Sequence, residues 1–331
     1  MMNPQILFTL LAMVSSTMLC GLSDAQEATK DKTKTRAFEL AYAATIEGVP
    51  KDATVRVWFP VAKSNKWQEV KVKSSEFPNK HSVAEDASFG NKIGYFKVEN
   101  PTKPVSFQLT YDVVRKETTT QVAKTKLTDQ QKTVFLQKNK FVPTSGKPTE
   151  LLKDQKLPED RLAAGRTLYD LVGQHMKYDK SIAGYGKGDV LRACDVGAGN
   201  CTDFHSLFIS LARNQKIPSR FEIGFPLPAS AVGKSGSGEI KGYHCWAWFH
   251  SPDNGWVPVD ISEADKDPSN RDYFFGNLTA DRVAFSTGRD IKLVPESKSE
   301  PLNYFIYPHV EVDGKVWPKE KVVTKFGYKN R

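Results

Sequence analysis

Cys201, His244 and Asp260 have the residue types and the chain order of a thiol catalytic triad. Cys201 lies in the first turn of segment 199–218, where apolar residues recur with the period of a helix and Asn200 can cap the start. Exposed backbone N–H groups and the positive end of the helix dipole stabilise a thiolate at such a position. The same N–H groups can hold the oxyanion that forms when a thiolate attacks a carbonyl carbon. The position of Cys201 therefore predicts a nucleophile.

His244 is the candidate base. Whether Asp260 can orient its imidazole depends on how two predicted strands pair. If residues 251–255 form the loop between these strands, Asp260 lies diagonally beside His244 on the same face of the sheet. A two-residue turn would separate the two side chains. With the longer loop, Asp260 holds one imidazole nitrogen and sets the tautomer, which leaves the other nitrogen for Cys201.

Two tryptophans share the predicted strand 243–250 with His244. Side chains alternate along a strand, so Trp246 and Trp248 lie on the same face as His244. Both are candidates for the wall of a substrate groove, with packing against the core as the alternative. His205, one turn after the nucleophile, is expected to be a hydrogen-bonded structural histidine.

The chain has four cysteines: Cys20, Cys194, Cys201 and Cys245. Removal of an N-terminal export signal would leave three, and an odd number leaves one thiol unpaired in an oxidising compartment. A disulfide between Cys194 and Cys245 would leave Cys201 free, although spacing alone does not establish that bond. A metal site made of these cysteines and nearby histidines is the rival, but the Cys-x6-Cys and His-Cys spacing matches no ordinary zinc pattern. We therefore expect no metal and no other cofactor.

The first part of the chain has the pattern of β structure. Apolar and polar residues alternate over 105–113 with the two-residue period of a strand, and 55–59 alternates likewise before Pro60. Further strands are expected at 37–46, 67–73 and 92–98. The segment 37–115 is therefore predicted to be a small antiparallel β-sandwich domain.

A change of period marks the second part of the chain. Residues 116–157 are predicted to link two domains and to hold one short helix, with Thr128 and Gln131 as a capping box. From Pro158, which suits the first turn of a helix, apolar residues follow the helical period. Segment 158–331 is predicted to be the catalytic domain.

The N-terminus and the charge bear on location and partners. Residues 1–25 combine an apolar run with small residues at a cleavage site, which predicts an export signal, and 26–36 are a polar leader. That apolar run is too short for a stable membrane span, and no other stretch is long enough. The formal net charge is +9, but lysines are scattered and no aromatic–basic motif accompanies them, so nucleic-acid binding is not expected. We expect an exported protein, periplasmic or extracellular, with anionic cell-envelope polymers as candidate partners.

Three stretches resemble bacterial members of the transglutaminase-like superfamily. They are RACDVGAGNCTDFHSLFISLARNQKIPSRFEIGFPLP, GYHCWAWF and GWVPVDISEADK, and the similarity covers roughly residues 158–310. The resemblance implies an α+β fold, a papain-like transglutaminase core preceded by the small all-β sandwich. It places the family's nucleophile on Cys201, its base on His244 and its orienter on Asp260. Animal transglutaminases stabilise the oxyanion with an upstream tryptophan; here the nearest aromatic hydroxyl is that of Tyr178.

These observations predict an exported enzyme of thiol acyl transfer that attacks a carboxamide or peptide bond of a protein or peptide. Acceptance of an amine would make it transglutaminase-like, and acceptance of water would make it a cysteine protease or amidase. The alternative is a non-enzymatic envelope-binding protein that uses the same fold.

Overall fold

The computed structural model describes residues 34–229 and 236–331. The predicted export signal, residues 1–25, and most of the predicted leader, 26–36, lie outside the described residues.

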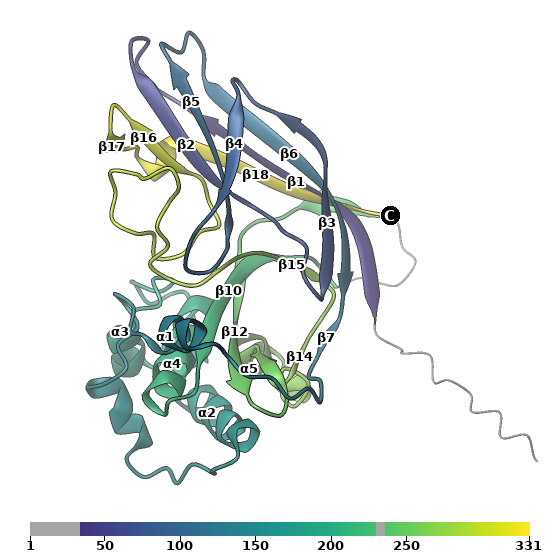
Figure 1. Ribbon diagram of the computed structural model, residues 1–331, viewed down its shortest axis with the longest axis vertical. Helices are drawn as coiled ribbons and strands as arrows, with labels where there is room; N and C mark the ends of the chain where they lie inside the picture. Colours follow the sequence, from purple (N-terminus) through teal and green to yellow (C-terminus); the bar gives the residue numbers. More distant parts are fainter. Residues whose placement is uncertain (1–33, 230–235) are drawn as a thin grey trace, which may run out of the picture. The chain divides into compact units, whose positions relative to one another are not determined.

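Two five-stranded antiparallel sheets form a β-sandwich (Figure 1). The strand order is β11-β18-β1-β6-β3 in one sheet and β17-β16-β2-β5-β4 in the other. Their bounds are β1 Thr35–Ile46, β2 Thr54–Val61, β3 Gln68–Glu76, β4 His81–Glu85, β5 Lys92–Glu99, β6 Val105–Lys116, β11 Ser237–Glu239, β16 His309–Val312, β17 Lys315–Val316 and β18 Val322–Asn330.

The alternating pattern of the sequence explains how these sheets pack. In β6, Val105, Phe107 and Leu109 are buried while the residues between them are exposed, as the two-residue period predicts. The ring of Phe107 lies 4.8 Å, between centroids, from that of Phe59 in β2 on the opposing sheet. Burying such a side chain contributes roughly 1.5–3 kcal/mol, so the inner rows of the two sheets stabilise the sandwich.

The end of the chain completes the sandwich, which differs from the expectation that 158–331 belongs to the catalytic domain. β18 pairs with β1, and β16 pairs with β2 through partners such as His309 and Trp58. Strand pairing between distant segments leaves no local mark in a sequence. Two smaller differences concern strand ends: β2 continues through Pro60 to Val61, and β4 was not expected because most of its residues are exposed.

A four-stranded antiparallel sheet and its helices form the α/β part, so the predicted α+β fold is confirmed. The strand order is β13-β12-β10-β15. The strands are β10 Ser219–Pro226, β12 His244–Ser251, β13 Gly255–Val259 and β15 Arg282–Thr287; the helices are α1 Asp129–Leu136, α2 Arg161–His175, α3 Val190–Val196, α4 Cys201–Asn214 and α5 Ile261–Lys266.

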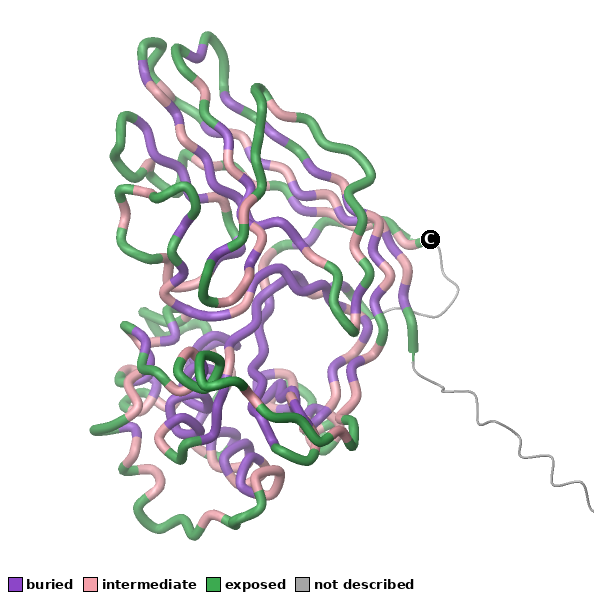
Figure 2. The backbone as a smooth tube through the Cα atoms, in the orientation of Figure 1, coloured by how far each residue is buried: buried purple, intermediate pink, exposed green. Residues whose placement is uncertain are grey.

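Helix α4 is the central element of this part. Every residue from Cys201 to Arg213 is buried, because α4 packs on β10 and β12 with one side and against α2, α3 and α5 with others (Figure 2). The close packing requires a glycine in α2. A Cβ at Gly165 would lie 2.3 Å from the ring of Phe249 in β12.

The predicted linker 116–157 packs on the core and contains α1 and the 3-10 helix η1. Thr128 and Gln131 form the expected capping box of α1. Pro158 precedes α2, which is capped by Asp160. The remaining short elements are β7 Thr118–Thr119, β8 Lys177–Tyr178, β9 Ala198–Gly199, β14 Asn277–Leu278, η1 Lys147–Leu152, η2 Pro268–Asn270 and η3 Lys319–Lys321. Across 34–229 and 236–331, no helix has the length and apolar character needed to cross a membrane.

Candidate active site

Cys201 is the first residue of α4, and two neighbouring side chains fix the start of that helix. Oδ1 of Asn200 accepts a hydrogen bond from the N–H of Thr202 at 2.9 Å, so Asn200 is the cap that the sequence predicts. Oδ2 of Asp203 accepts from the N–H of Asn200 at 2.9 Å. As the first helical residue, Cys201 has an N–H without an acceptor inside the helix. The thiol therefore lies at the positive end of the helix dipole.

Asp203 also holds the glycine-containing loop beside Cys201. Its Oδ2 accepts from the N–H of Gly186 at 2.8 Å and its Oδ1 from the N–H of Gly188 at 3.0 Å. Gly188 has a φ of +62°, and a Cβ there would lie 2.3 Å from Oγ of Ser206. Only glycine fits this position, so the loop is fixed against the start of α4.

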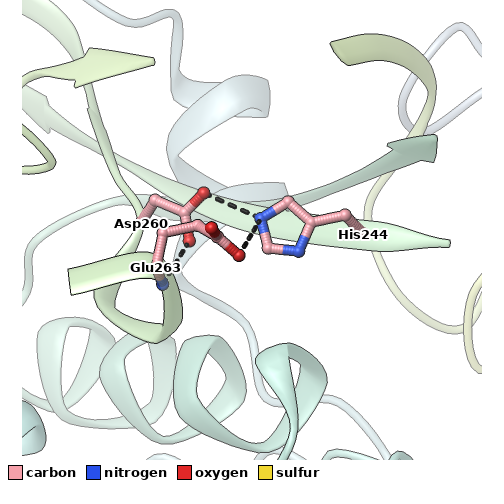
Figure 3. A group of neighbouring side chains, drawn as sticks. All are labelled: His244, Asp260 and Glu263. Atoms are coloured by element: carbon pink, nitrogen blue, oxygen red, sulfur yellow. Dashed lines mark hydrogen bonds and ion pairs between the residues drawn. The ribbon is translucent and has the colours of Figure 1, made fainter. Parts of the chain in front are cut away.

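The strands β12 and β13 pair in the predicted register. Trp248 lies opposite Pro258 and His250 opposite Trp256. Ser251 and Gly255 also pair, so three residues rather than five connect the strands. Asp260 follows the end of β13, and its Oδ2 lies 2.8 Å from Nε2 of His244 (Figure 3).

Asp260 is fully buried, and both of its carboxylate oxygens are engaged. Oδ2 accepts from His244 and from Nη1 of Arg282, each at 2.8 Å. Oδ1 accepts from Oγ of Ser262 and from the N–H of Glu263, each at 3.2 Å, which makes Asp260 the N-cap of α5. Burial alone would raise the pKa of Asp260, but the charges of His244 and Arg282 hold that pKa well below its usual value. The carboxylate is therefore ionised and fixed.

Cys201 and His244 shift each other's pKa. Burial opposes the charged imidazole, but the charge and hydrogen bond of Asp260 and the contact with Cys201 raise the pKa of His244 to about 10. Burial also opposes the thiolate, but hydrogen bonds with Cys245 and His244 and the charge of His244 hold the pKa of Cys201 well below its usual value. Both shifts favour the charged pair, a thiolate and an imidazolium. Nε2 faces Asp260, so Nδ1 is the nitrogen left for the sulfur.

His205 connects the helix of Cys201 to the helix that follows Asp260. Its ring is fully buried and hydrogen-bonded to the backbone of Cys201, and its Nε2 accepts from the N–H of Ile261 at 3.1 Å. Burial lowers the pKa of His205 to about 4, so this imidazole is neutral at physiological pH. The contacts match the expected structural histidine.

Cys194, Cys201 and Cys245 are all free thiols, so the disulfide considered between Cys194 and Cys245 is not formed. Cys194 is half-buried on α3, and burial raises its pKa to about 11. Cys245 is fully buried next to Cys201, and burial raises its pKa well above the usual value. Of these three thiols, only Cys201 has conditions that favour the reactive thiolate.

His244, Asp260 and Glu263 place metal-ligand atoms within 4.8 Å of one another (Figure 3). Nε2 of His244 lies 3.9 Å from Oε1 of Glu263. However, the histidine nitrogen already bonds to Asp260, and the guanidinium of Arg282 lies 2.8 Å from the same carboxylate. A cation would meet that positive charge, so the group suits an oriented imidazole better than a metal centre.

A cavity of about 330 Å³ lies beside Cys201. Its lining is rich in phenol and ammonium groups: Tyr178, Tyr185, Tyr243, Tyr304, Tyr307, Lys180 and Lys187. No aspartate or glutamate of the described residues lines it. The opening therefore gives a substrate access to the thiol and disfavours a positively charged group near it.

Residues 149–261, which include the cysteine, the histidine and the aspartate, match the transglutaminase-like superfamily. The chain carries a transglutaminase-like domain. The domain holds the whole of α2, α3, α4, β10, β12 and β13, which position these side chains.

One curated protein and several solved structures are similar to this chain. An uncharacterized protein of Haemophilus influenzae is 36% identical over 169 residues, which are 43% of this chain and 46% of that protein. The match thus spans about half of that relative's length. A proposed cysteine protease from Cytophaga hutchinsonii has a similar fold, with a TM-score of 0.52 and 16% identity over 90% of this chain and 100% of that one. The periplasmic domain of TgpA from Pseudomonas aeruginosa has a TM-score of 0.36 and 14% identity, with coverages of 71% and 92%.

The sequence also singles out one tyrosine and two tryptophans, and these differ in whether they line the cavity beside Cys201. Tyr178 lines the cavity beside Cys201, where the oxyanion candidate was expected. Trp246 is fully buried and Trp248 nearly so, and both donate their indole N–H to Oε2 of Glu222, at 2.6 and 2.9 Å. Neither tryptophan lines that cavity.

Arg282 is the main residue of the candidate site that sequence reasoning missed. It lies on β15, at the edge of the sheet, and reaches Asp260 across strands that are distant in sequence. An arginine in a strand carries no local sign of an ion pair. A buried carboxylate stays ionised only beside a cation. An orienting role for Asp260 inside the core therefore implied a nearby arginine or lysine, although not which one.

Proposed function

We propose that this protein is a thiol acyl-transfer enzyme in which Cys201 is the nucleophile, His244 the general acid and base, and Asp260 the orienter. The observation that carries the proposal is the buried hydrogen bond between His244 and Asp260, at 2.8 Å, beside a thiol at the start of α4 whose pKa His244 helps to hold below its usual value. A helix start, a paired base and an oriented tautomer are the three requirements of a nucleophilic thiol.

The reaction has two stages. The thiolate of Cys201 attacks the carbonyl carbon of a carboxamide or peptide bond, and the tetrahedral intermediate then loses its C–N bond as His244 gives a proton to the leaving amine. This step leaves a thioester on Cys201 and a neutral imidazole. Water or a primary amine then attacks the thioester while His244 accepts its proton, and the thiolate is restored.

Two groups beside the thiol suit the oxyanion of that intermediate. One is the N–H of Cys201, at the start of α4, and the other is the phenol of Tyr178 on the same cavity. Tyr178 is placed by β8, which pairs with Gly199 of β9, two residues before Cys201. Donors fixed before the reaction stabilise developing negative charge most effectively.

The expected substrate is a protein or peptide with a neutral or acidic segment around the attacked carbonyl. Lys180 and Lys187 line the cavity, and no carboxylate of the described residues lines it, which supports this preference. The apolar run and small residues within 1–25 support export to the periplasm or the exterior.

A trapping experiment tests the proposal. The full chain is incubated with glutamine-containing peptides and a biotinylated primary amine, quenched in acid, and mapped by mass spectrometry. We expect an acyl adduct on Cys201 that Cys201→Ala lacks and the control Cys194→Ala retains. Turnover by Cys201→Ala would contradict the proposal. Absence of acyl transfer from every amide, together with equal binding of an envelope polymer by wild type and Cys201→Ala, would favour the binding protein instead.

A further inference from the structure

A second cavity, of about 290 Å³, lies where β3 and β6 of the sandwich meet the sheet β13-β12-β10-β15. It shares no lining residue with the cavity beside Cys201. Its walls include three tryptophans, two arginines and a glutamate: Trp67, Trp248, Trp256, Arg115, Arg220 and Glu222. The cavity is therefore separate from the proposed chemistry.

Arg220 is a cation without an acceptor in this cavity. Its guanidinium carbon lies 5.0 Å from the ring centroid of Trp248 and 4.4 Å from that of Trp256. Its Nε is buried without a hydrogen-bond partner, and no residue of 34–229 or 236–331 accepts a bond from its other nitrogens. Two indole faces hold the guanidinium in place, but they do not use its N–H donors.

Glu222 is the one carboxylate among the described residues that line this cavity, and it is already hydrogen-bonded. Oε2 of Glu222 accepts the indole N–H of Trp246 at 2.6 Å and that of Trp248 at 2.9 Å. Arg115 is almost fully buried and donates to Gln68 and Thr118, yet its Nε also has no partner. Two guanidinium groups thus face one carboxylate that bonds elsewhere, which makes the cavity suited to an anion.

The remaining walls indicate what kind of anion fits. Trp67 and Trp256 are only half-buried, so each can offer to the apolar face of a ligand the part of its indole ring that Lys66 or Arg220 leaves uncovered. Asn65, Gln121 and Asn254 add amide groups around the opening, which can bond to hydroxyls. The volume lies near the lower limit for small-molecule sites, enough for one ring. A pyranose ring with a carboxylate combines an apolar C–H face, hydroxyls and one negative charge, and these are the features that such walls can contact.

We propose that this cavity binds a carboxylate-bearing sugar unit of an anionic polysaccharide. The sugar carboxylate accepts bidentate hydrogen bonds from Arg220, and the pyranose ring packs against Trp256 and Trp67. Binding at this cavity does not depend on Cys201, so it would hold the enzyme on an anionic glycan while the thiol acts on a peptide.

Isothermal titration of the full chain with oligogalacturonate tests the site, with a neutral cello-oligosaccharide of equal length and poly-glutamate as comparison ligands. Arg220→Gln should weaken oligogalacturonate binding by about tenfold or more, the usual loss for a hydrogen-bonded charge. Arg56→Gln is the matched control, because Arg56 also stacks on a tryptophan, Trp58 at 4.5 Å, but has a carboxylate partner in Glu311. Arg56→Gln and Cys201→Ala should bind as wild type does.

Three results would overturn the proposal: no binding of oligogalacturonate to wild type, equal binding of the neutral oligosaccharide, or undiminished binding by Arg220→Gln. Tighter binding of poly-glutamate that is lost in Arg220→Gln would assign the cavity to acidic peptides instead. Loss of acyl transfer in Cys201→Ala with unchanged glycan binding separates this proposal from the catalytic one.

Discussion

Two groups of charged side chains lie on the same four-stranded sheet and differ in how their charges are paired. At one end, both oxygens of Asp260 are engaged, by His244 and Arg282 on one side and by the start of α5 on the other. In the tryptophan-lined cavity, Arg220 is held by two rings but donates to no residue of 34–229 or 236–331. Arg282 therefore has a carboxylate to which it donates, whereas Arg220 lies near the carboxylate of Glu222 but donates to no residue that the structure describes.

The difference separates orientation from recognition. A carboxylate whose oxygens all accept hydrogen bonds fixes the imidazole beside it in one tautomer and one position. A catalytic base requires both. A cation with free donors costs stability in the empty protein and recovers that cost when an anionic ligand binds. The pairing of buried charges therefore points to chemistry at Asp260 and to binding at Arg220.

The largest effect is expected from loss of the reacting pair. Cys201→Ala removes the nucleophile and His244→Ala removes the proton carrier, so each should lower kcat on the order of 10⁴-fold or more. Cys194→Ala, on α3, is the control and should keep full activity. Circular dichroism should show folded protein in every case. Full activity of either triad variant would place the reaction elsewhere.

Asp260→Asn should lower kcat less than loss of the nucleophile does. The fold-loss in kcat should be roughly a hundredfold smaller. The imidazole remains, but its orientation and its raised pKa lose their main cause. The basic limb of the pH–rate profile should then move below pH 10, towards the ordinary value of histidine. Asp170→Asn removes another carboxylate between two arginines, Arg166 and Arg271, and should leave the profile unchanged. If the basic limb of the pH–rate profile did not move in Asp260→Asn, Asp260 would not be the residue that orients His244.

Two arginine variants sharpen the comparison through stability. Arg282→Gln breaks a buried ion pair with Asp260, so it should lower the free energy of unfolding by about 3–5 kcal/mol. Arg220→Gln removes a cation that forms no ion pair with any described residue, so in the absence of ligand its effect should stay within about 1 kcal/mol. Urea denaturation measures both. Similar losses in the two variants would remove the distinction between the groups.

Sequence reasoning could reach the parts of the site that local patterns encode. The cap at Asn200 and the period of the following residues located the start of α4, and alternation with a longer loop gave the register of β12 and β13. Long-range pairing was out of reach. Neither the return of β18 to the first strand nor the reach of Arg282 to Asp260 leaves a local pattern.

The second cavity illustrates the same limit. Trp248 was considered as the wall of a groove because it shares a strand face with His244. The groove it does line also needs Trp67 and Arg115 from the sandwich. Those residues meet Trp248 only through the packing of segments far apart in sequence. A strand face can be read from alternation, but the surface that covers it cannot.

Iodoacetamide labelling across pH, mapped by mass spectrometry, tests the thiolate–imidazolium pair most directly. The pKa of Cys201 is held well below that of an ordinary thiol, so Cys201 should react rapidly at about pH 6, where free cysteine is almost entirely protonated. Cys194 and Cys245, whose pKa values are raised, should stay unlabelled in the folded protein at that pH. His244→Ala should abolish the advantage of Cys201. Labelling of Cys201 that rises only near the pKa of free cysteine, or equal labelling of all three thiols, would contradict the account.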